Sequence, residues 1–333
     1  LADERLAVQL SGGPPPGRTL PLDERFPFPE RPDRERLATM TRDLLGADEV
    51  CRWEPSVEQA CRHRLDAMAR PQRFDLVSDF ADQVSVAVVA EVLGVAADRR
   101  GAFARVCASL RPTLDALVCP QRLDVARQIL DGAAALDAFA AEAAAKTPFD
   151  GDRDAAGAVA ALLAAVAVPA AANLIGNTVL ALIDDDLGWG RLRDCPDLTA
   201  AAVTETLRHD PPVRLEARHA RQDLELAGVA VPAGGQVVVA LGATGRDPGV
   251  HSDPDRFDVT RYDVSSRDGI PVEPLALSAQ SGHSLVGPLA RMIAVTAVRS
   301  LVDQRPTLHR NGPALRHRRS PVLHDLIQAP VAA

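Results

Sequence analysis

The sequence predicts a mainly helical protein with a small antiparallel β region, a mainly α (α+β) fold. Across residues 34–210 apolar side chains recur at the three- and four-residue spacing of helices. Residues 218–248 instead alternate apolar and polar side chains between glycines, as short antiparallel strands do. No internal repeat divides the chain, so we expect a single domain spanning 1–333. Because "LADERLAVQL" (1–10) already has a helical pattern, we expect the amino-terminal portion of the domain to be missing.

The first half of the chain is predicted to be a series of helices that follow a Pro-, Gly- and Arg-rich loop at 11–33. Residues 74–95 begin as an extended stretch and continue as an amphipathic helix. This helix ends at Gly94, which tolerates a positive φ. The predicted helices cover 34–45, 57–69, the later part of 74–95, 98–118 and 121–145.

The longest apolar stretch, residues 152–185, predicts a helix that runs through the middle of the domain. It is hydrophobic nearly all round, which is typical of a buried helix. Pro169 lies inside it and should kink the helix or remove one backbone hydrogen bond. A shorter helix at 197–210 is expected to stop at Pro211 and Pro212.

The last third combines strands with one more helix. After the strands of 218–248, the loop 261–274 leads into "LALSAQSGHSLVGPLARM" (275–292). In that segment Gly282 and Gly287 can take a positive φ, and Pro288 suits the first turn of a helix at 289–301. The terminal segments "PTLHR", "ALRHRR" and "PVLHDL" are predicted to be strands.

Composition excludes several classes of function. The net charge of −8 argues against broad attraction to nucleic acid, and the basic run 316–319 fits a solvated or sheet-edge face. We find no signal peptide and no uninterrupted run of 18 apolar residues, so we expect a cytoplasmic protein with no membrane contact. No metal is expected, because the cysteines are scattered without metal-ligand spacing and fit free thiols. They are Cys51, Cys61, Cys107, Cys119 and Cys195.

The order of motifs from 152 to 327 resembles that of bacterial cytochrome P450. "ETLR" (205–208) matches the Glu-x-x-Arg motif of that family, and "RFDVTR" (256–261) follows "DPD" as it does there. "AANLIGNTVLAL" (171–182) resembles the later half of the central helix that crosses the haem, and "GPLARM" (287–292) the helix after the haem ligand. The resemblance covers the last half of the chain strongly and the first half in outline. It implies a cytochrome P450 fold.

The resemblance implies a buried, fold-anchoring ion triad of Glu205, Arg208 and Arg256. Glu205 and Arg208 lie three residues apart on one helix face, and Arg256 matches the arginine that completes the family's triad. We expect these three residues to hold the fold together, and we do not expect them to be catalytic.

The resemblance also implies that the haem ligand has been lost. A P450 holds its haem iron through a cysteine thiolate. The family pattern Phe-Gly-x-Gly-x-His-x-Cys-x-Gly becomes "LSAQSGHSLV" (277–286), which places Ser284 at the ligand position. A neutral hydroxyl does not replace a thiolate, and no cysteine follows Cys195. A single laboratory substitution does not explain this, because all six signature positions differ: Leu277, Ser278, Gln280, Gly282, Ser284 and Val286.

Two further family sites give the same indication. The acid–alcohol pair that delivers protons on the central helix corresponds to Pro169 and Ala170, neither of which relays a proton. The His and Arg that contact a haem propionate from an early helix correspond to Arg34 and Ala38, so one partner is missing. Arg218 matches another propionate-contacting arginine, although a strand arginine also has structural uses.

Haem-less P450 homologues of this kind resemble the auxiliary proteins of deoxysugar glycosyltransferases in actinobacterial macrolide and anthracycline pathways. The resemblance implies a non-catalytic pseudoenzyme without cofactor that binds, stabilises and activates its glycosyltransferase. It also implies a complex of two transferases with two auxiliary chains. The sequence does not locate the contact face, for which the early Pro-rich segment and the helices within 34–69 are candidates.

Two alternatives stay open at this point. One is a haem-binding P450-type oxidoreductase in which His283 ligates the iron, although Ser284 holds the ligand register. The other is a small-molecule binding protein that uses the space vacated by haem. The replacements within 277–286 and the alanines at 170–172 predict that side chains fill this space instead.

Overall fold

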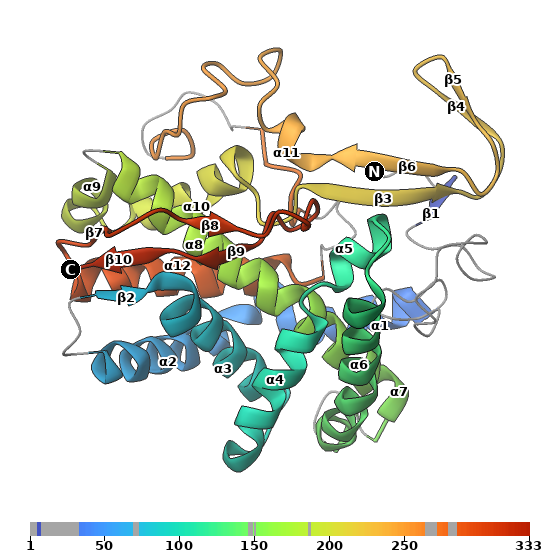
Figure 1. The fold of residues 1–333 in the computed structure, drawn as a ribbon, viewed down its shortest axis with the longest axis horizontal. Coiled ribbons are helices and arrows are strands. Elements are labelled where there is room, and N and C mark those ends of the chain that lie inside the picture. Colours follow the sequence, from blue (N-terminus) through green and yellow to red (C-terminus); the bar gives the residue numbers. More distant parts are fainter. Residues whose placement is uncertain are drawn as a thin grey trace.

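The computed structural model describes residues 5–7, 33–68, 73–145, 149, 151–185, 188–263, 272–278 and 285–333, with side chains omitted for 33–37. Figure 1 shows a helical body with a small β region along its upper edge and across its front. The helices are α1 (Asp33–Leu45), α2 (Glu54–Ala67), α3 (Asp82–Val92), α4 (Arg100–Leu110), α5 (Thr113–Val118), α6 (Leu123–Ala144), α7 (Arg153–Leu162), α8 (Val168–Asp184), α9 (Gly188–Asp194), α10 (Leu198–His209), α11 (Leu241–Thr244) and α12 (Gly287–Gln304).

The strands of the described residues form small antiparallel sheets. One sheet has the order β1-β3-β6, a second β2-β10-β7, and the pairs β4-β5 and β8-β9 form two hairpins. Their bounds are β1 (Leu6–Ala7), β2 (Arg73–Asp75), β3 (Leu215–Ala220), β4 (Leu224–Leu226), β5 (Val229–Val231), β6 (Gln236–Ala240), β7 (His309–Arg310), β8 (Leu315–Arg316), β9 (Leu326–Gln328) and β10 (Pro330–Ala332). The predicted α+β class is therefore confirmed.

The central helix is one continuous element of 32 residues from Arg153 to Asp184. A π-helical turn, η4 (Leu163–Ala167), joins α7 to α8, and the Val168 amide donates to the carbonyl of Leu163. The wider turn comes directly before Pro169, whose missing N–H removes one donor. The predicted break in the backbone hydrogen bonding therefore takes the form of a π turn. The helix is long and apolar enough to cross a membrane, yet 94% of its most apolar stretch is buried inside the protein, as in a core helix.

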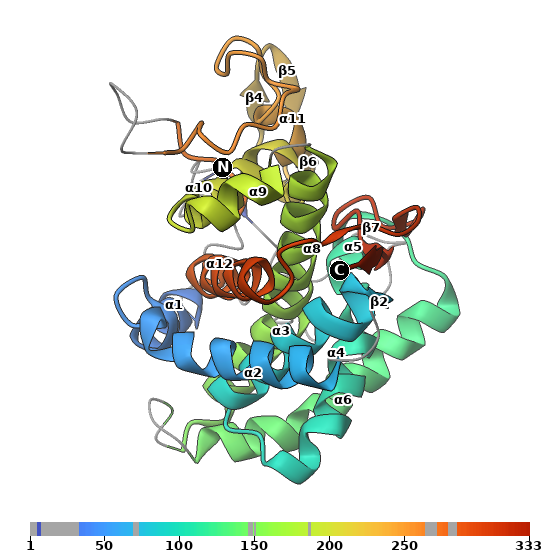
Figure 2. The same cartoon turned by 90° about the vertical axis from the view of Figure 1, so that its left-hand side faces the viewer.

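Figure 2 shows α8 in the middle of the molecule, between α10 above and α3 below, with α12 beside it. The core is continuous from α2 and α3 through α8 to α12. Small side chains on α8 allow this close packing of helices, because alanine and glycine let neighbouring backbones approach. Gly176 makes room in the same way for strand β9, since an added Cβ would lie 2.8 Å from Cδ1 of Leu326.

Three expectations need correction. Residues 6–7 form a strand and not a helix, because their backbone pairs with Ala220 and His219 of β3. The predicted helix at 98–118 is interrupted at Pro112, whose ring cannot continue the hydrogen bonding of α4 into α5. "PVLHDL" (321–326) is mostly a turn, and its last residue, Leu326, begins β9. The predicted loop over 11–32 lies outside the described residues.

The start of α12 is held by a close backbone approach. A Cβ at Gly287 would lie 2.2 Å from the carbonyl oxygen of Leu277. Gly287 is not among the residues with positive φ, so the need for glycine is one of space and not of conformation. Leu277 itself is in the left-handed region, with φ of 57°. Gly94 does end α3 with a positive φ of 67°, as predicted.

We predict that Gly287→Ala lowers the free energy of unfolding by about 1–3 kcal/mol, because the new methyl group must push apart two backbone segments. Urea denaturation followed by circular dichroism measures this change. Gly190→Ala in α9 is the matched control, since nothing lies within 4 Å of its added Cβ. Its stability should stay unchanged or rise slightly. Equal stability of the two variants would contradict the close approach.

Candidate functional site

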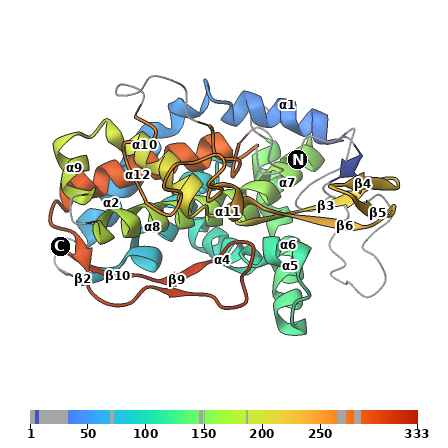
Figure 3. The same cartoon turned by 90° about the horizontal axis from the view of Figure 1, so that it is seen from above.

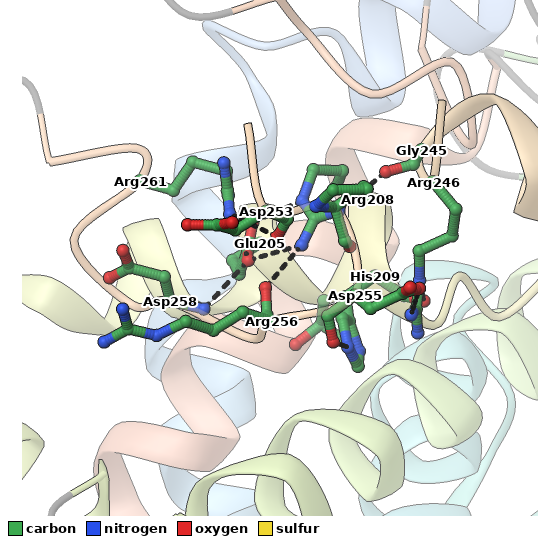
Figure 4. Close-up of polar contacts among 12 residues, drawn as sticks. Glu205, Arg208, His209, Gly245, Arg246, Asp253, Asp255, Arg256, Asp258 and Arg261 are labelled. Atoms are coloured by element: carbon green, nitrogen blue, oxygen red, sulfur yellow. Dashed lines mark hydrogen bonds and ion pairs between the residues drawn. The ribbon is translucent and has the colours of Figure 1, made fainter. Parts of the chain in front are cut away.

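A buried ion network joins α10 to the segment that follows β6 (Figure 4). The side chains of Glu205 and Arg208 are both 0% exposed. Arg208 donates from Nε and Nη2 to the two carboxylate oxygens of Glu205, at 2.8 and 2.7 Å. It also donates to the backbone carbonyls of Gly245, Pro254 and Arg256, at 2.6, 2.6 and 2.9 Å. All five donors of the guanidinium group are thus engaged.

The third side chain of this network is Arg261, and the prediction that Arg256 completes it was wrong. Arg261 Nε donates to Glu205 Oε1 over 3.2 Å, and the Arg261 side chain is only 6% exposed. Arg256 contributes its carbonyl, while its side chain is exposed and points away from Glu205 in Figure 4. The path of the backbone explains why Arg261 takes this place instead of Arg256. The amide of Asp258 donates to Glu205, so the chain passes the carboxylate between these two arginines.

The face of α8 that corresponds to the P450 proton relay is apolar and closed. Pro169 is buried at the start of α8, and Ala170 and Ala171 are 0% exposed. The residues of η4 before them are also 0% exposed. No acid or alcohol occupies this face between Leu163 and Ala172. These side chains are therefore out of contact with any solvent-sized space and pack directly against their neighbours.

The loop that would carry the haem ligand is described at its two ends only. Leu277 and Ser278 are 3% and 6% exposed, and Val286 at the other end is 0% exposed. Gln280, Gly282, His283 and Ser284 lie outside the described residues. The two described ends pack against each other through the Leu277 carbonyl and Gly287.

The arginine that matches a propionate contact has a partner within the protein. Arg218 of β3 is 4% exposed and forms an ion pair with Glu216, two residues earlier on the same face of the strand. Its Nη1 also donates to the carbonyl of Ala217 at 3.0 Å. A neighbouring carboxylate neutralises this guanidinium, which favours its structural role. Ala38 of α1 carries no polar group, and the side chain of Arg34 lies outside the described residues.

The two buried thiols are poor replacement ligands. Cys61 and Cys107 are buried, and burial raises the pKa of each thiol to about 12, so both remain protonated near neutral pH. Cys51 and Cys195 are exposed on the surface. Within the described residues no group of three or more His, Cys, Asp or Glu side chains could hold a metal ion.

The residues present do not fit haem. The residue that the family pattern aligns with the ligand is a serine, and no cysteine occurs in the last third of the sequence. The central helix presents apolar, fully buried side chains where the family places its proton relay. The arginine that matches the propionate contact is paired with a carboxylate. These observations leave the former haem site without its chemistry.

Sequence reasoning missed a second polar cluster, which fastens the carboxy-terminal segment to the helical body. Arg111 binds the two carboxylate oxygens of Asp325 through Nε and Nη2, both at 2.6 Å, and donates to Asp82 at 2.6 Å. Asn173 of α8 donates to Asp325 and accepts from the Leu326 amide. The members lie up to 243 residues apart, between Asp82 and Asp325, and no local spacing connects them.

We predict that Arg261→Gln and Arg256→Gln have different effects on stability. Arg261→Gln removes one charged hydrogen bond from the buried carboxylate of Glu205 and two from backbone carbonyls, and should cost about 1.5–3 kcal/mol. Arg256→Gln keeps the carbonyl that Arg208 uses and should change stability by less than about 0.5 kcal/mol. Thermal and urea denaturation of the two variants measure the difference. A larger loss for Arg256→Gln would restore the original assignment.

We predict that Ser284→Cys does not restore haem binding. A single thiol does not reopen the closed face of α8 and does not replace the other altered signature positions. The purified variant is incubated with haemin and its visible spectrum recorded in the oxidised and the reduced state. No Soret band above that of free haemin is expected. A stoichiometric Soret band would show that only the ligand had been missing.

Comparison with known proteins shows which family the chain is similar to. The sequence profile of the family "Cytochrome P450" matches residues 192–277, a region that contains the Glu205–Arg261 network and ends where the signature loop begins. The fold is shared with the crystal structure of P450BioI in complex with hexadec-9Z-enoic acid ligated acyl carrier protein. The TM-score is 0.77 at 26% identity, over 92% of this chain and 80% of that one. CYP164A2 of Mycobacterium smegmatis gives a TM-score of 0.78 at 26% identity, over 92% of this chain and 81% of that chain.

Three Streptomyces proteins are more similar in sequence. Protein AknT of Streptomyces galilaeus is 37% identical over 99% of this chain and 80% of its own length. Protein DesVIII of Streptomyces venezuelae is 39% identical over 97% of this chain and 74% of its own length. Protein TylM3 of Streptomyces fradiae is 40% identical over 80% of this chain, which covers 62% of TylM3. The chain therefore belongs to the cytochrome P450 family, in the group of P450-like glycosyltransferase auxiliary proteins of macrolide and anthracycline pathways.

Proposed function

We propose that this chain binds a deoxysugar glycosyltransferase of antibiotic biosynthesis in the cytoplasm, stabilises it and raises its activity without chemistry of its own. The membership of the auxiliary group supports a glycosyltransferase as the partner. We further propose a complex of two transferases with two auxiliary chains.

The closed, apolar face of α8 is the observation that carries this proposal. Pro169, Ala170 and Ala171 are buried where an oxygen-activating P450 needs a proton relay and room for a substrate. The fold-holding network around Glu205 is nevertheless complete in its hydrogen bonds. A protein that keeps the fold but lacks the reaction centre can still act by binding a partner through its surface.

A non-catalytic partner activates an enzyme by binding its active conformation more tightly than the inactive ones. The size of the effect is limited by the difference between these two affinities. The same linkage makes the stability of the transferase rise with the concentration of the auxiliary chain. Activation and stabilisation are therefore expected to show the same concentration dependence.

The two alternatives receive less support. A haem enzyme that uses His283 would still lack the proton relay at Pro169 and Ala170. A small-molecule carrier that reuses the haem space would need open volume along α8, where the residues of η4, Ala170 and Ala171 are fully buried. The glycosyltransferase activator is thus the function that the geometry supports best.

The test is co-expression with a tagged deoxysugar glycosyltransferase from the same organism. We expect the two proteins to co-purify, with a mass that corresponds to two copies of each. Turnover of the transferase should rise with added auxiliary chain to a plateau at equal stoichiometry. Glu205→Gln, which leaves buried Arg208 without its carboxylate, serves as a misfolded control that should not activate. Unchanged turnover together with separate elution of the two proteins would refute the proposed function.

A further inference from the structure

Two large apolar side chains are exposed on the hairpin formed by β8 and β9. Leu315 is 48% and Ile327 is 52% exposed, although Leu326 next to Ile327 is buried. Leu315 pairs with Gln328 and Arg316 pairs with Leu326, so Ile327 is an extra residue in β9. A regular strand would turn either Ile327 or Gln328 inward, whereas this bulge leaves both exposed. The hairpin therefore displays apolar surface on its outer side.

The same hairpin belongs to a basic part of an acidic chain. From Arg305 to the last residue there are five arginines and one aspartate, while the whole chain has a net charge of −8. Arg305, Arg310 and Arg316 are bonded to other groups of the protein. Arg318 and Arg319 follow β8 in the turn of the hairpin, are exposed, and form no ion pair with any of the described residues. Two exposed positive charges thus follow Leu315 three and four residues later in the chain.

The inner side of the hairpin is fixed to the central helix. Arg316 donates to Asn177 Oδ1 at 2.9 Å and to Asp210 Oδ2 at 2.8 Å. Leu326 packs over Gly176, whose missing Cβ makes room for it. A surface whose backbone is already ordered loses little conformational entropy when a partner binds it. The outer face is therefore presented on a rigid support.

A second set of contacts fixes the connection between the two strands. The buried carboxylate of Asp115 accepts from the Ser320 hydroxyl at 2.6 Å and from the Val322 amide at 2.8 Å. Arg111 holds Asp325 through two hydrogen bonds of 2.6 Å each. The turn that carries Arg318 and Arg319 is thus held on its carboxy-terminal side by α5 and by the end of α4.

Two other candidate faces of the described residues lack this combination. The sequence named the helices within 34–69 as candidates, but none of the large apolar side chains described in 38–68 is strongly exposed. Val229 and Val238 are exposed, yet they belong to two different sheets. Figure 3 shows α1 and β9 on opposite sides of the molecule, so the two candidate faces can be tested separately.

We infer that the outer face of the β8–β9 hairpin, formed by Leu315, Ile327, Arg318 and Arg319, is the docking surface for the glycosyltransferase. The inference rests on the proposed function. The transferase is expected to offer an apolar patch with an acidic rim, because that chemistry complements exposed aliphatic groups beside unpaired guanidinium groups. An acidic partner is repelled by most of a chain with net charge −8 and attracted at this hairpin, which orients the encounter.

The test compares variants of the full chain in binding to the glycosyltransferase that co-purifies with the wild type. Ile327→Ser should raise the dissociation constant about tenfold or more at both low and high salt, because the loss is apolar contact at the centre of the patch. Arg318→Glu should raise it about tenfold at low salt and less at high salt, since mobile ions screen exposed charges. Biolayer interferometry at two salt concentrations measures both effects.

Each variant has a matched control. Val250→Ser removes an apolar side chain of the same 52% exposure from another loop, and Arg42→Glu reverses an exposed charge on α1. Both controls should bind like the wild type, and circular dichroism should show all four variants to be folded. Wild-type affinity of the two hairpin variants, or an equal loss for Arg42→Glu, would overturn the inference while leaving the proposed function intact.

Two further outcomes distinguish the glycosyltransferase from other partners that could bind the hairpin. If Ile327→Ser changes the sedimentation of the chain alone and leaves transferase binding intact, the hairpin contacts a second copy of this chain and the inference is wrong. If the wild-type chain itself does not bind the transferase, the proposed function fails, and the inference fails with it.

Discussion

The buried guanidinium of Arg208 is the constraint on which the rest of the structure depends. A charge without solvent exposure is tolerated only when every donor has a partner, and Arg208 satisfies this through Glu205 and three backbone carbonyls. Those carbonyls belong to the segment between Gly245 and Arg256, so the network fixes the path of a long stretch without regular strands. At Gly245 the backbone lies so close to α10 that an added Cβ would be 2.0 Å from the Arg208 carbonyl oxygen. Removing any member would leave buried polar groups unpaired.

The residues that hold the fold are separate from those that the family uses for chemistry. The first group lies on α10 and between Gly245 and Arg261, and the second on α8 and in the loop before α12. The hydrogen bonds of Arg208 and Arg261 run to Glu205 and to backbone carbonyls between Gly245 and Arg256, so a change at 169–172 does not unpair them. The face of α8 that corresponds to the proton relay shows the result of such substitutions. Small apolar side chains at 170–172 pack against the core, and the π turn at Leu163–Ala167 keeps the helix continuous ahead of Pro169.

Sequence reasoning succeeded where the signal is local. Helical spacing predicted α1, α6 and the long central helix to within a few residues, because each is amphipathic or apolar over many turns. Glu205 and Arg208 were paired correctly because they lie three apart on one helix. Arg261 was missed because two arginines flank the same turn, and only the path of the backbone at Asp258 decides which one reaches Glu205. The Arg111–Asp325 cluster had no local signal at all, since its partners are 214 residues apart.

The polar contacts of the carboxy-terminal segment show how a helix without a reaction centre remains structurally important. Three polar residues of α8 are bonded to this segment: Asn173 to Leu326, Asn177 to Arg316 and Asp184 to Arg310. Asp325 also accepts from Arg111 at the end of α4. The carboxy-terminal segment, α8 and α4, which are far apart in the sequence, therefore meet at one carboxylate. A surface supported in this way resists deformation when a partner binds. The binding free energy is then available to shift the partner's conformational equilibrium instead of ordering the auxiliary chain, which is the physical requirement for a non-catalytic activator.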